Sequence, residues 1–335
     1  MIKKYLKLLV DQAVNQAAVG LESALISRID ASANNLSTRI GQLEDSSESR
    51  IGDAIARRLF IPNLEIAALA DYGEFIRHST CSAADFFHPR YSEIAAMLHH
   101  PPVLHRKLWE WIYIIHKLLK AKAVGPGKRG LVFGVGAEKL PALFASMGAL
   151  VVATDAPPEI DGASGWDKVG QHANSLENLR FPELIPDEEF DRRVTHRFSD
   201  MRAIDADLMG FDFTWSSCCF EHLGSLEAGM QFVIDSVENT LKIGGIAVHT
   251  TEFNLSSGAD TVESGPTVVY RRRDIVALIE RLRDRGHDVE PFSIAPDSHY
   301  LDYYVDVPPY RHNPHIKLTN GQYVTTSVGI VARRG

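Results

Sequence analysis

The sequence predicts an α/β protein, in which a long N-terminal helix precedes a doubly wound, mostly parallel seven-stranded sheet with an antiparallel edge strand. Two observations support this prediction. From Gly130 onward, short apolar runs typical of buried strands alternate with longer segments of helical periodicity. Such alternation is characteristic of a parallel sheet covered by helices on both faces. Residues 1–60, in contrast, contain neither proline nor tryptophan and show one long helical repeat.

A thin apolar stripe runs along residues 1–60. Ile29, Ile40 and Ile51 are eleven residues apart, and Leu25 and Leu36 keep the same spacing. Eleven residues in three turns correspond to about 3.67 residues per turn, which favours a straight or slightly right-handed coiled coil. Because so narrow a stripe buries little surface alone, we expect it to pair with other copies in a homo-oligomer. A loosely ordered amphipathic tail is the alternative.

Residues 61–125 are predicted to form a helical lead-in to the sheet. Pro62 ends the first helix, because proline cannot continue the hydrogen-bond pattern of a helix interior. A turn rich in glycine and proline closes the lead-in before the first strand. The predicted helices of this part are residues 64–78, 92–100 and 103–122.

Residues 126–335 contain the predicted α/β domain. Its final two strands are expected to form an antiparallel hairpin at the sheet edge, with residues 296–320 inserted between them. That insertion is rich in tyrosine and histidine, a composition that suits carbohydrate or a packed edge loop. The predicted strands lie within residues 130–136, 149–155, 192–201, 211–220, 244–253, 287–295 and 322–334, and the helices within 140–148, 226–241 and 272–286.

Charge and composition exclude several classes of protein. The formal net charge is −8, whereas a protein built to hold nucleic acid is expected to be basic. Three cysteines form no disulfide framework, and no Cys/His spacing indicates zinc, so we predict no metal and a cytoplasmic location. No apolar run reaches the length of about 20 residues that spans a bilayer. The basic residues 1–10 suit either an inner-membrane surface or a solvated helix start.

The first predicted strand ends in a glycine turn. Gly134 and Gly136 let the backbone approach a ligand closely, at the point where the next helix begins. Asp155 ends the following strand, 21 residues beyond Gly134. A carboxylate in that place is suited to accept hydrogen bonds from ribose hydroxyls. The pattern is shared by enzymes that use NAD and enzymes that use S-adenosylmethionine.

Further motifs resemble the class I S-adenosylmethionine-dependent methyltransferases, over roughly residues 103–333. They are Ser199-Asp200-Met201, Phe220-Glu221-His222-Leu223 and Leu241-Lys242-Ile243-Gly244-Gly245, which follow the third strand, follow the fourth and precede the fifth. The resemblance implies a Rossmann-like fold, S-adenosylmethionine as the cofactor and an acid that contacts the adenine amino group. It implies cofactor contacts from Gly134, Gly136, Glu138, Asp155, Asp200, Met201 and Ser217.

The chain departs from that family at two positions of the glycine turn. Val132 stands where the family often has an acid, and Glu138 replaces the third glycine. We expect Glu138 to face the cofactor's ammonium group or to cap the turn. Arg106 or Lys107 would then reach the cofactor carboxylate, unless their helix lies on the surface.

Two residues are predicted to act on the acceptor. His222 lies just beyond strand four, at the edge where such sheets bind ligands, and histidine is the most frequent general base. A helix cap or a contact to the cofactor is the alternative role. Glu252, near the end of strand five, is expected to contact the acceptor, and His249 to be packed and hydrogen-bonded. Cys218 and Cys219 are expected in the core.

The segments 211–226 and 244–254 resemble a narrower group of bacterial methyltransferases associated with polysaccharide assembly. That resemblance implies a sugar hydroxyl as acceptor, O-antigen-like polysaccharide as the product and, with the coiled coil, chain termination. It implies a glycan partner and association with the inner membrane or a glycosyltransferase. The alternatives are a methyltransferase of small molecules or lipids, and an inactive scaffold of the same fold.

Overall fold

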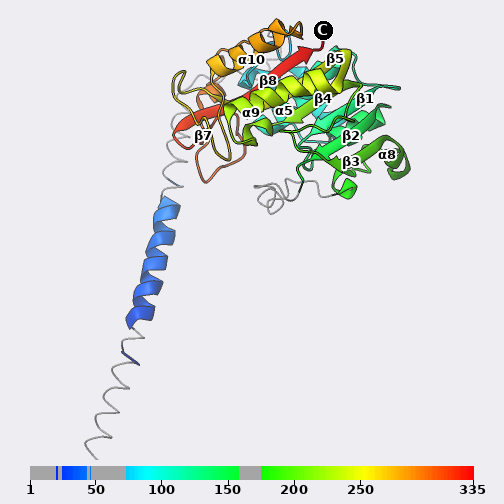
Figure 1. Ribbon diagram of the computed structural model, residues 1–335. Coiled ribbons are helices and arrows are strands. Elements are labelled where there is room, and N and C mark those ends of the chain that lie inside the picture. The colour runs from blue at the N-terminus through cyan, green and yellow to red at the C-terminus, as the bar shows by residue number, and fades with distance from the viewer. Residues whose placement is uncertain (1–19, 22–24, 44–45, 47–72, 158–174) are drawn as a thin grey trace, which may run out of the picture. The chain divides into compact units, whose positions relative to one another are not determined.

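The structure is a computed structural model that describes residues 20–21, 25–43, 46, 73–157 and 175–335 (Figure 1). The chain divides into two compact units, Met1–Ala70 and Asp71–Gly335. In the first unit, residues 25–43 are helical. Residues 1–10, for which membrane contact was considered, lie outside the described residues. Among the described helices, none combines the length and the hydrophobicity that a membrane span requires.

Three helices precede the sheet in the second unit. They are α3 (Ala83–Phe87), α4 (Pro89–Met97) and α5 (Arg106–Lys120). The predicted helices at 92–100 and 103–122 are confirmed as α4 and α5, with shifted ends, whereas α3 was not expected. The described part of the predicted helix 64–78, residues 73–78, is not helical. His105 caps α5, since its Nδ1 accepts a hydrogen bond from the Lys107 backbone N–H at 3.1 Å.

Five parallel strands form most of the described sheet, in the order β3-β2-β1-β4-β5, and β8 and β6 follow beyond β5. The predicted antiparallel end is confirmed, because β8 runs antiparallel to β5 and β6. A short eighth strand, β7, was not expected and pairs with β8 inside the predicted insertion. The strands are β1 (Arg129–Phe133), β2 (Leu150–Asp155), β3 (Val194–Phe198), β4 (Phe211–Ser217), β5 (Leu241–Asn254), β6 (Asp288–Val289), β7 (Leu318–Asn320) and β8 (Tyr323–Arg333).

Helices cover both faces of this sheet, and each face has its own core. One core contains residues of α4, α5, α6 (Leu140–Ser146) and α8 (Asp187–Arg193), packed against Phe213 and Trp215. The other lies beneath α9 (Leu226–Asp235) and α10 (Arg272–Asp284), which lie close together in Figure 1. The lead-in helices therefore share a core with the sheet. Shorter helical turns are Leu176–Leu179, Phe220–His222, Ser236–Thr240 and Tyr300–Tyr303.

The strand order determines where a ligand fits. From β1 the chain continues to β2 on one side, while β4 pairs with β1 on the other. The connections leave the central strand in opposite directions, and this reversal opens a crevice beyond the carboxyl ends of the strands. The glycine turn after β1 and Asp155 at the end of β2 are both at this edge.

Candidate functional site

A cavity of about 700 Å³ opens at the carboxyl ends of β1, β2 and β4. Eight of the ten predicted site residues line it, and the two that do not are Arg106 and Glu252. Segments far apart in the sequence therefore meet at one place, as the strand order requires. The lining residues are Lys107, Trp111, Gly134 to Glu138, Asp155, Ala156, Asp200 to Arg202, Ser217 to Cys219, His222 to Gly224, Gly265 and Pro266.

The glycine turn forms one wall of the cavity. Gly134 and Gly136 have φ values of 59° and 52°, a conformation that favours glycine. A Cβ on Gly134 would lie 2.9 Å from Cβ and Sγ of Cys219, so no side chain fits there. Asp155 braces the turn, because its Oδ2 accepts a hydrogen bond from the Gly136 N–H at 3.0 Å. The turn is thus held open beside a carboxylate.

Asp200 and Met201 form the neighbouring wall, after β3. Asp200 accepts hydrogen bonds from the backbone N–H of Arg202 at 2.9 Å and from its guanidinium. These contacts hold the carboxylate at the cavity edge while its side chain stays 29% exposed. An acceptor therefore stands beside the thioether of Met201, an arrangement that suits a flat ring with an amino group.

Glu138 is a buried acid in the wall of the cavity. Its Oε1 accepts a hydrogen bond from the indole N–H of Trp215 at 2.7 Å, and only 4% of the residue is exposed. Burial raises the pKa of Glu138 to about 8, although the Trp215 bond opposes the change. At pH 7 the group is therefore mostly neutral. It would not repel a ligand carboxylate, and it would ionise beside a bound cation.

Arg106 lies in a buried ionic cluster and does not line the cavity. Its guanidinium pairs with Glu252 and, at 3.2 Å, with Glu110. Ser327 accepts a further hydrogen bond from it at 3.2 Å. The expected contact with a cofactor carboxylate is not available to Arg106 in this arrangement. Lys107, the alternative considered from the sequence, does line the cavity.

Glu252 has the same structural surroundings and is not placed to meet an acceptor in the cavity. Its second carboxylate oxygen accepts hydrogen bonds from Asn320 at 3.1 Å and Thr325 at 3.3 Å. Burial opposes ionisation of Glu252, but the charges of Arg106 and Lys107 and the hydrogen bonds from Asn320 and Arg106 together keep its pKa below the ordinary value. Glu252 therefore serves as the counter-ion of Arg106.

His249 is packed as expected. Ser216 and Ser236 contact its two ring nitrogens at 2.7 and 2.9 Å, and burial lowers its pKa to about 3. The neutral ring, with a hydrogen-bond partner at each nitrogen, has a structural role in the core and no access to a ligand.

His222 reaches the cavity from the turn after β4. Its Nδ1 lies 2.9 Å from the carbonyl oxygen of Pro266 and 3.2 Å from Oγ1 of Thr267. In the tautomer that donates from Nδ1 to Pro266, Nε2 carries the lone pair. Glu221 lies 4.0 Å from Nε2. The side chain of His222 is 24% exposed. The ring can therefore accept a proton from a ligand in the cavity.

Cys218 and Cys219, which the sequence placed within a strand, follow the end of β4 and line the cavity. Cys218 is buried as expected, whereas Cys219 is only partly buried. Cys218 has a φ of 52°, and this turn redirects the chain after the strand. Burial raises the pKa of both thiols. Trp111, Gly265 and Pro266 also line the cavity without any local motif that marks them.

A second feature of the site is the grouping of Cys218, Glu221 and Glu252, whose potential ligand atoms lie within 4.8 Å of one another. The guanidinium of Arg106 already occupies the position of a cation there, since it contacts Glu252 and lies 3.6 Å from the Cys218 sulfur. We therefore interpret this group as part of the ionic cluster rather than as a metal site.

No protein-family model and no curated protein matches the chain. Similar solved structures include a methyltransferase from Clostridium acetobutylicum that depends on S-adenosylmethionine, with 14% identity, TM-score 0.36 and coverage of 73% of this chain and 98% of that one. A glycopeptide N-methyltransferase has 14% identity, TM-score 0.39 and coverage of 66% and 94%. Magnesium protoporphyrin IX methyltransferase from Synechocystis, with bound SAH, has 11% identity, TM-score 0.39 and coverage of 75% and 97%. These identities and TM-scores are too low to assign a function to the chain, so its function is inferred from its own cavity.

The buried acid makes a first prediction about stability. Because the pKa of Glu138 rises on folding, wild-type protein loses free energy of unfolding as pH increases from about 4.5 to about 8. The loss is about 1.4 kcal/mol per pH unit at most. Glu138→Gln removes this titration and keeps an acceptor for Trp215, so its advantage over wild type should grow between pH 5 and 8. Urea unfolding at several pH values measures the difference.

The exposed Glu280→Gln serves as the control for this experiment, because no buried charge is removed. A difference between Glu138→Gln and wild type that does not change with pH would contradict a neutral Glu138.

Proposed function

We propose that the protein is a methyltransferase that uses S-adenosylmethionine. The observation that carries this proposal is the meeting of the glycine turn, Asp155 and Asp200 around one cavity at the reversal of strand order. Gly134 and Gly136 line the cavity with positive φ, and their lack of side chains suits close approach of a ligand to the backbone. The motifs after β3 and β4 and before β5 support the same class of enzyme.

Different residues of the cavity would contact different parts of the cofactor. Asp155 would accept hydrogen bonds from the ribose, and Asp200 with Met201 would hold the adenine. Glu138 would face the ammonium group, since its carboxyl can ionise beside a cation. Lys107 would face the carboxylate. The cofactor supplies an electrophilic methyl group, so the protein mainly positions and deprotonates the acceptor.

The acceptor that we propose is a sugar hydroxyl of a bacterial, O-antigen-like polysaccharide. A hydroxyl is a weak nucleophile at neutral pH, and removal of its proton during attack assists the reaction. His222 lines the cavity, and in the tautomer that donates from Nδ1 to Pro266 its Nε2 would take this proton. The resemblance of residues 211–226 and 244–254 to methyltransferases of polysaccharide assembly supports a glycan, with methylation ending the chain.

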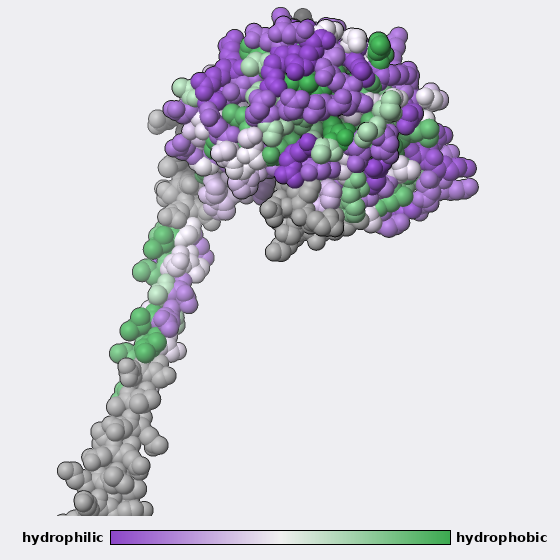
Figure 2. All heavy atoms as spheres, in the orientation of Figure 1, coloured by the Kyte–Doolittle hydropathy of each residue, from purple (hydrophilic) through white to green (hydrophobic). Residues whose placement is uncertain are grey.

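The N-terminal helix supports a second part of the proposal, which is self-association. Large apolar side chains lie along one side of this helix in Figure 2, and each of them is about half exposed or more. An exposed apolar stripe with an eleven-residue repeat is expected to pair with other copies. We expect the protein to act as an oligomer beside the membrane or a glycosyltransferase. The stripe within the described residues comprises Leu21, Leu25, Ile29, Leu36, Ile40 and Leu43.

Cofactor binding is the first test of this proposal. Titration calorimetry should show S-adenosylmethionine and S-adenosylhomocysteine binding to the purified full-length chain. Asp155→Asn should weaken both by about 10- to 100-fold, because hydrogen bonds to a charged acceptor contribute about 1.5–3 kcal/mol. The exposed Asp284→Asn should bind like wild type. Absence of binding to wild type would favour the inactive scaffold.

The role of His222 is tested by methyl transfer. Surface polysaccharide from cells that lack the gene is the acceptor, and mass spectrometry detects the added methyl group. His222→Asn should lower kcat by about 10²- to 10⁴-fold, the usual contribution of a general base, while cofactor affinity stays unchanged. Unchanged transfer would rule out His222 as the base. Methylation of free metabolites or lipids but not of glycan would favour the alternative substrates.

Self-association is tested by the molar mass in solution, measured by light scattering after size exclusion. Ile29→Asp and Leu36→Asp place a charge in the apolar stripe and should dissociate the oligomer. Asn34→Asp adds the same charge on the opposite side of the helix and should leave the mass unchanged. A monomeric wild type, or equal masses for all variants, would refute the coiled coil.

A further inference from the structure

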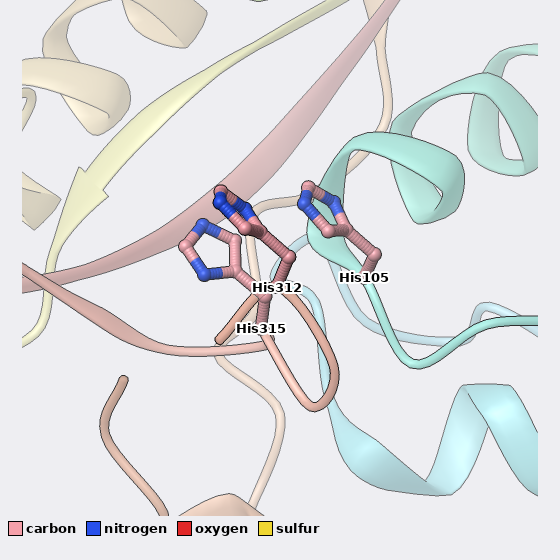
Figure 3. A group of neighbouring side chains, drawn as sticks. All are labelled: His105, His312 and His315. Carbon is pink, nitrogen blue, oxygen red and sulfur yellow. The ribbon is translucent and has the colours of Figure 1, made fainter. Parts of the chain in front are cut away.

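Three histidines from distant parts of the sequence meet outside the cavity. His105 caps α5, and His312 and His315 lie in the loop before β7 (Figure 3). Each offers a ring nitrogen that lies within 4.8 Å of the other two. The ring centroids of His105 and His315 are 4.6 Å apart, and those of His312 and His315 are 5.6 Å apart. The rings therefore form a compact group of imidazoles.

Backbone contacts hold this group together. Residues 105 and 315 form a parallel bridge, in which the Arg106 N–H donates to the His315 carbonyl at 3.0 Å. The His315 N–H in turn donates to the carbonyl of Leu104 at 2.7 Å. The two segments are thus joined by the main chain, so the proximity of the rings does not depend on side-chain rotation alone.

A buried carboxylate orients one of the rings. Asp306 is 1% exposed, and its Oδ2 lies 2.6 Å from Nδ1 of His315. The same carboxylate accepts the backbone N–H groups of Arg311 and His312, which shapes the loop. With Asp306 on Nδ1, the lone pair of His315 is on Nε2. Histidine ligands of metals typically have such a carboxylate on the other nitrogen.

The rings of His312 and His105 differ in what each must give up to bind a metal ion. His312 is exposed and open to an ion from solvent. His105 accepts the Lys107 N–H with Nδ1, so its coordination gives up this one helix-cap bond. The charge of Arg106, the next residue, is already balanced by Glu252 and Glu110. The three imidazoles, when neutral, can therefore offer lone pairs to a cation.

The identity of the ion follows from the donors. Three imidazoles without a carboxylate in the group favour Zn²⁺ and related transition metals, whereas Mg²⁺ and Ca²⁺ prefer oxygen ligands. Three histidines also leave the fourth position of a tetrahedral ion to water. None of the three residues lines the cavity described above. The site is therefore distinct from the reacting centre.

We propose that His105, His312 and His315 bind one Zn²⁺ ion, which joins the loop before β7 to the start of α5. The ion would fasten residues 306–315 to the helix that carries Arg106 and Lys107. The site then acts as a positioning clamp next to the catalytic cavity. Binding should also raise the melting temperature, because the ion prefers the folded chain.

The test uses full-length protein without an affinity tag, after metal removal with a chelator. Zn²⁺ is added in competition with a chromophoric chelator, and the bound metal is counted by elemental analysis. Wild type should bind one Zn²⁺ per chain. His312→Asn should weaken zinc binding by at least about 10- to 100-fold. Loss of a residue that only supports a metal ligand already costs this much, and loss of the ligand itself should cost no less. Co²⁺ in place of zinc should give the visible absorption of a tetrahedral nitrogen site.

His99→Asn is the matched control. His99 and His312 are both exposed and both have positive φ, a conformation that asparagine tolerates. The control should bind zinc like wild type. Failure of wild type to retain zinc, or equal binding by His312→Asn and His99→Asn, would overturn the proposal. These readouts need no S-adenosylmethionine, so they are independent of the proposed methyl transfer.

Discussion

The arrangement of the described site depends on the ion pairs and hydrogen bonds of the buried Arg106 guanidinium. It joins the first turn of α5 to β5 through Glu252 and to β8 through Ser327, while Glu110 on its own helix completes the cluster. Removal of one member would leave an uncompensated buried charge, which is strongly destabilising. Because α5 begins at this residue, the same contact places Lys107 at the cavity on one side and His105 in the histidine group on the other. The sequence suggested a ligand contact for Arg106, whereas the structure shows why the helix is held where it is.

The cavity is formed by the topology of the sheet, and two acids, Asp155 and Glu138, line it. The reversal of strand order brings the ends of β1, β2 and β4 together, so residues distant in sequence share one wall. Asp155 braces the glycine turn and lines the cavity. Glu138 occupies a place where a third glycine is common in the family that the sequence resembles, and its burial keeps it mostly neutral at pH 7. This resolves an apparent conflict in the sequence, because a neutral acid does not repel a cofactor carboxylate.

Much of the fold could be predicted from local patterns. Strands β1 to β5 and helices α6, α9 and α10 have the periodicity and turn residues of their class, and the glycine turn with Asp155 indicates the ligand edge. What could not be predicted depends on contacts between distant segments. The pairing of Arg106 with Glu252 keeps both residues out of the cavity lining. Cys218 lines the cavity because β4 ends at Ser217, the residue before it. The histidine group joins His105 to a loop some two hundred residues later, and only the His312-x-x-His315 spacing marks it locally.

Different parts of the chain have different proposed tasks. The sheet edge would hold the cofactor, His222 would take the acceptor proton, and the N-terminal helix would bring copies together. The central proposal, that S-adenosylmethionine occupies the cavity at the β1–β2–β4 edge, is tested most directly by a crystal structure with S-adenosylhomocysteine. We expect density for the ligand against the glycine turn, with its ribose at Asp155 and its adenine beside Asp200 and Met201. Density elsewhere, or an empty cavity at saturating ligand, would contradict it.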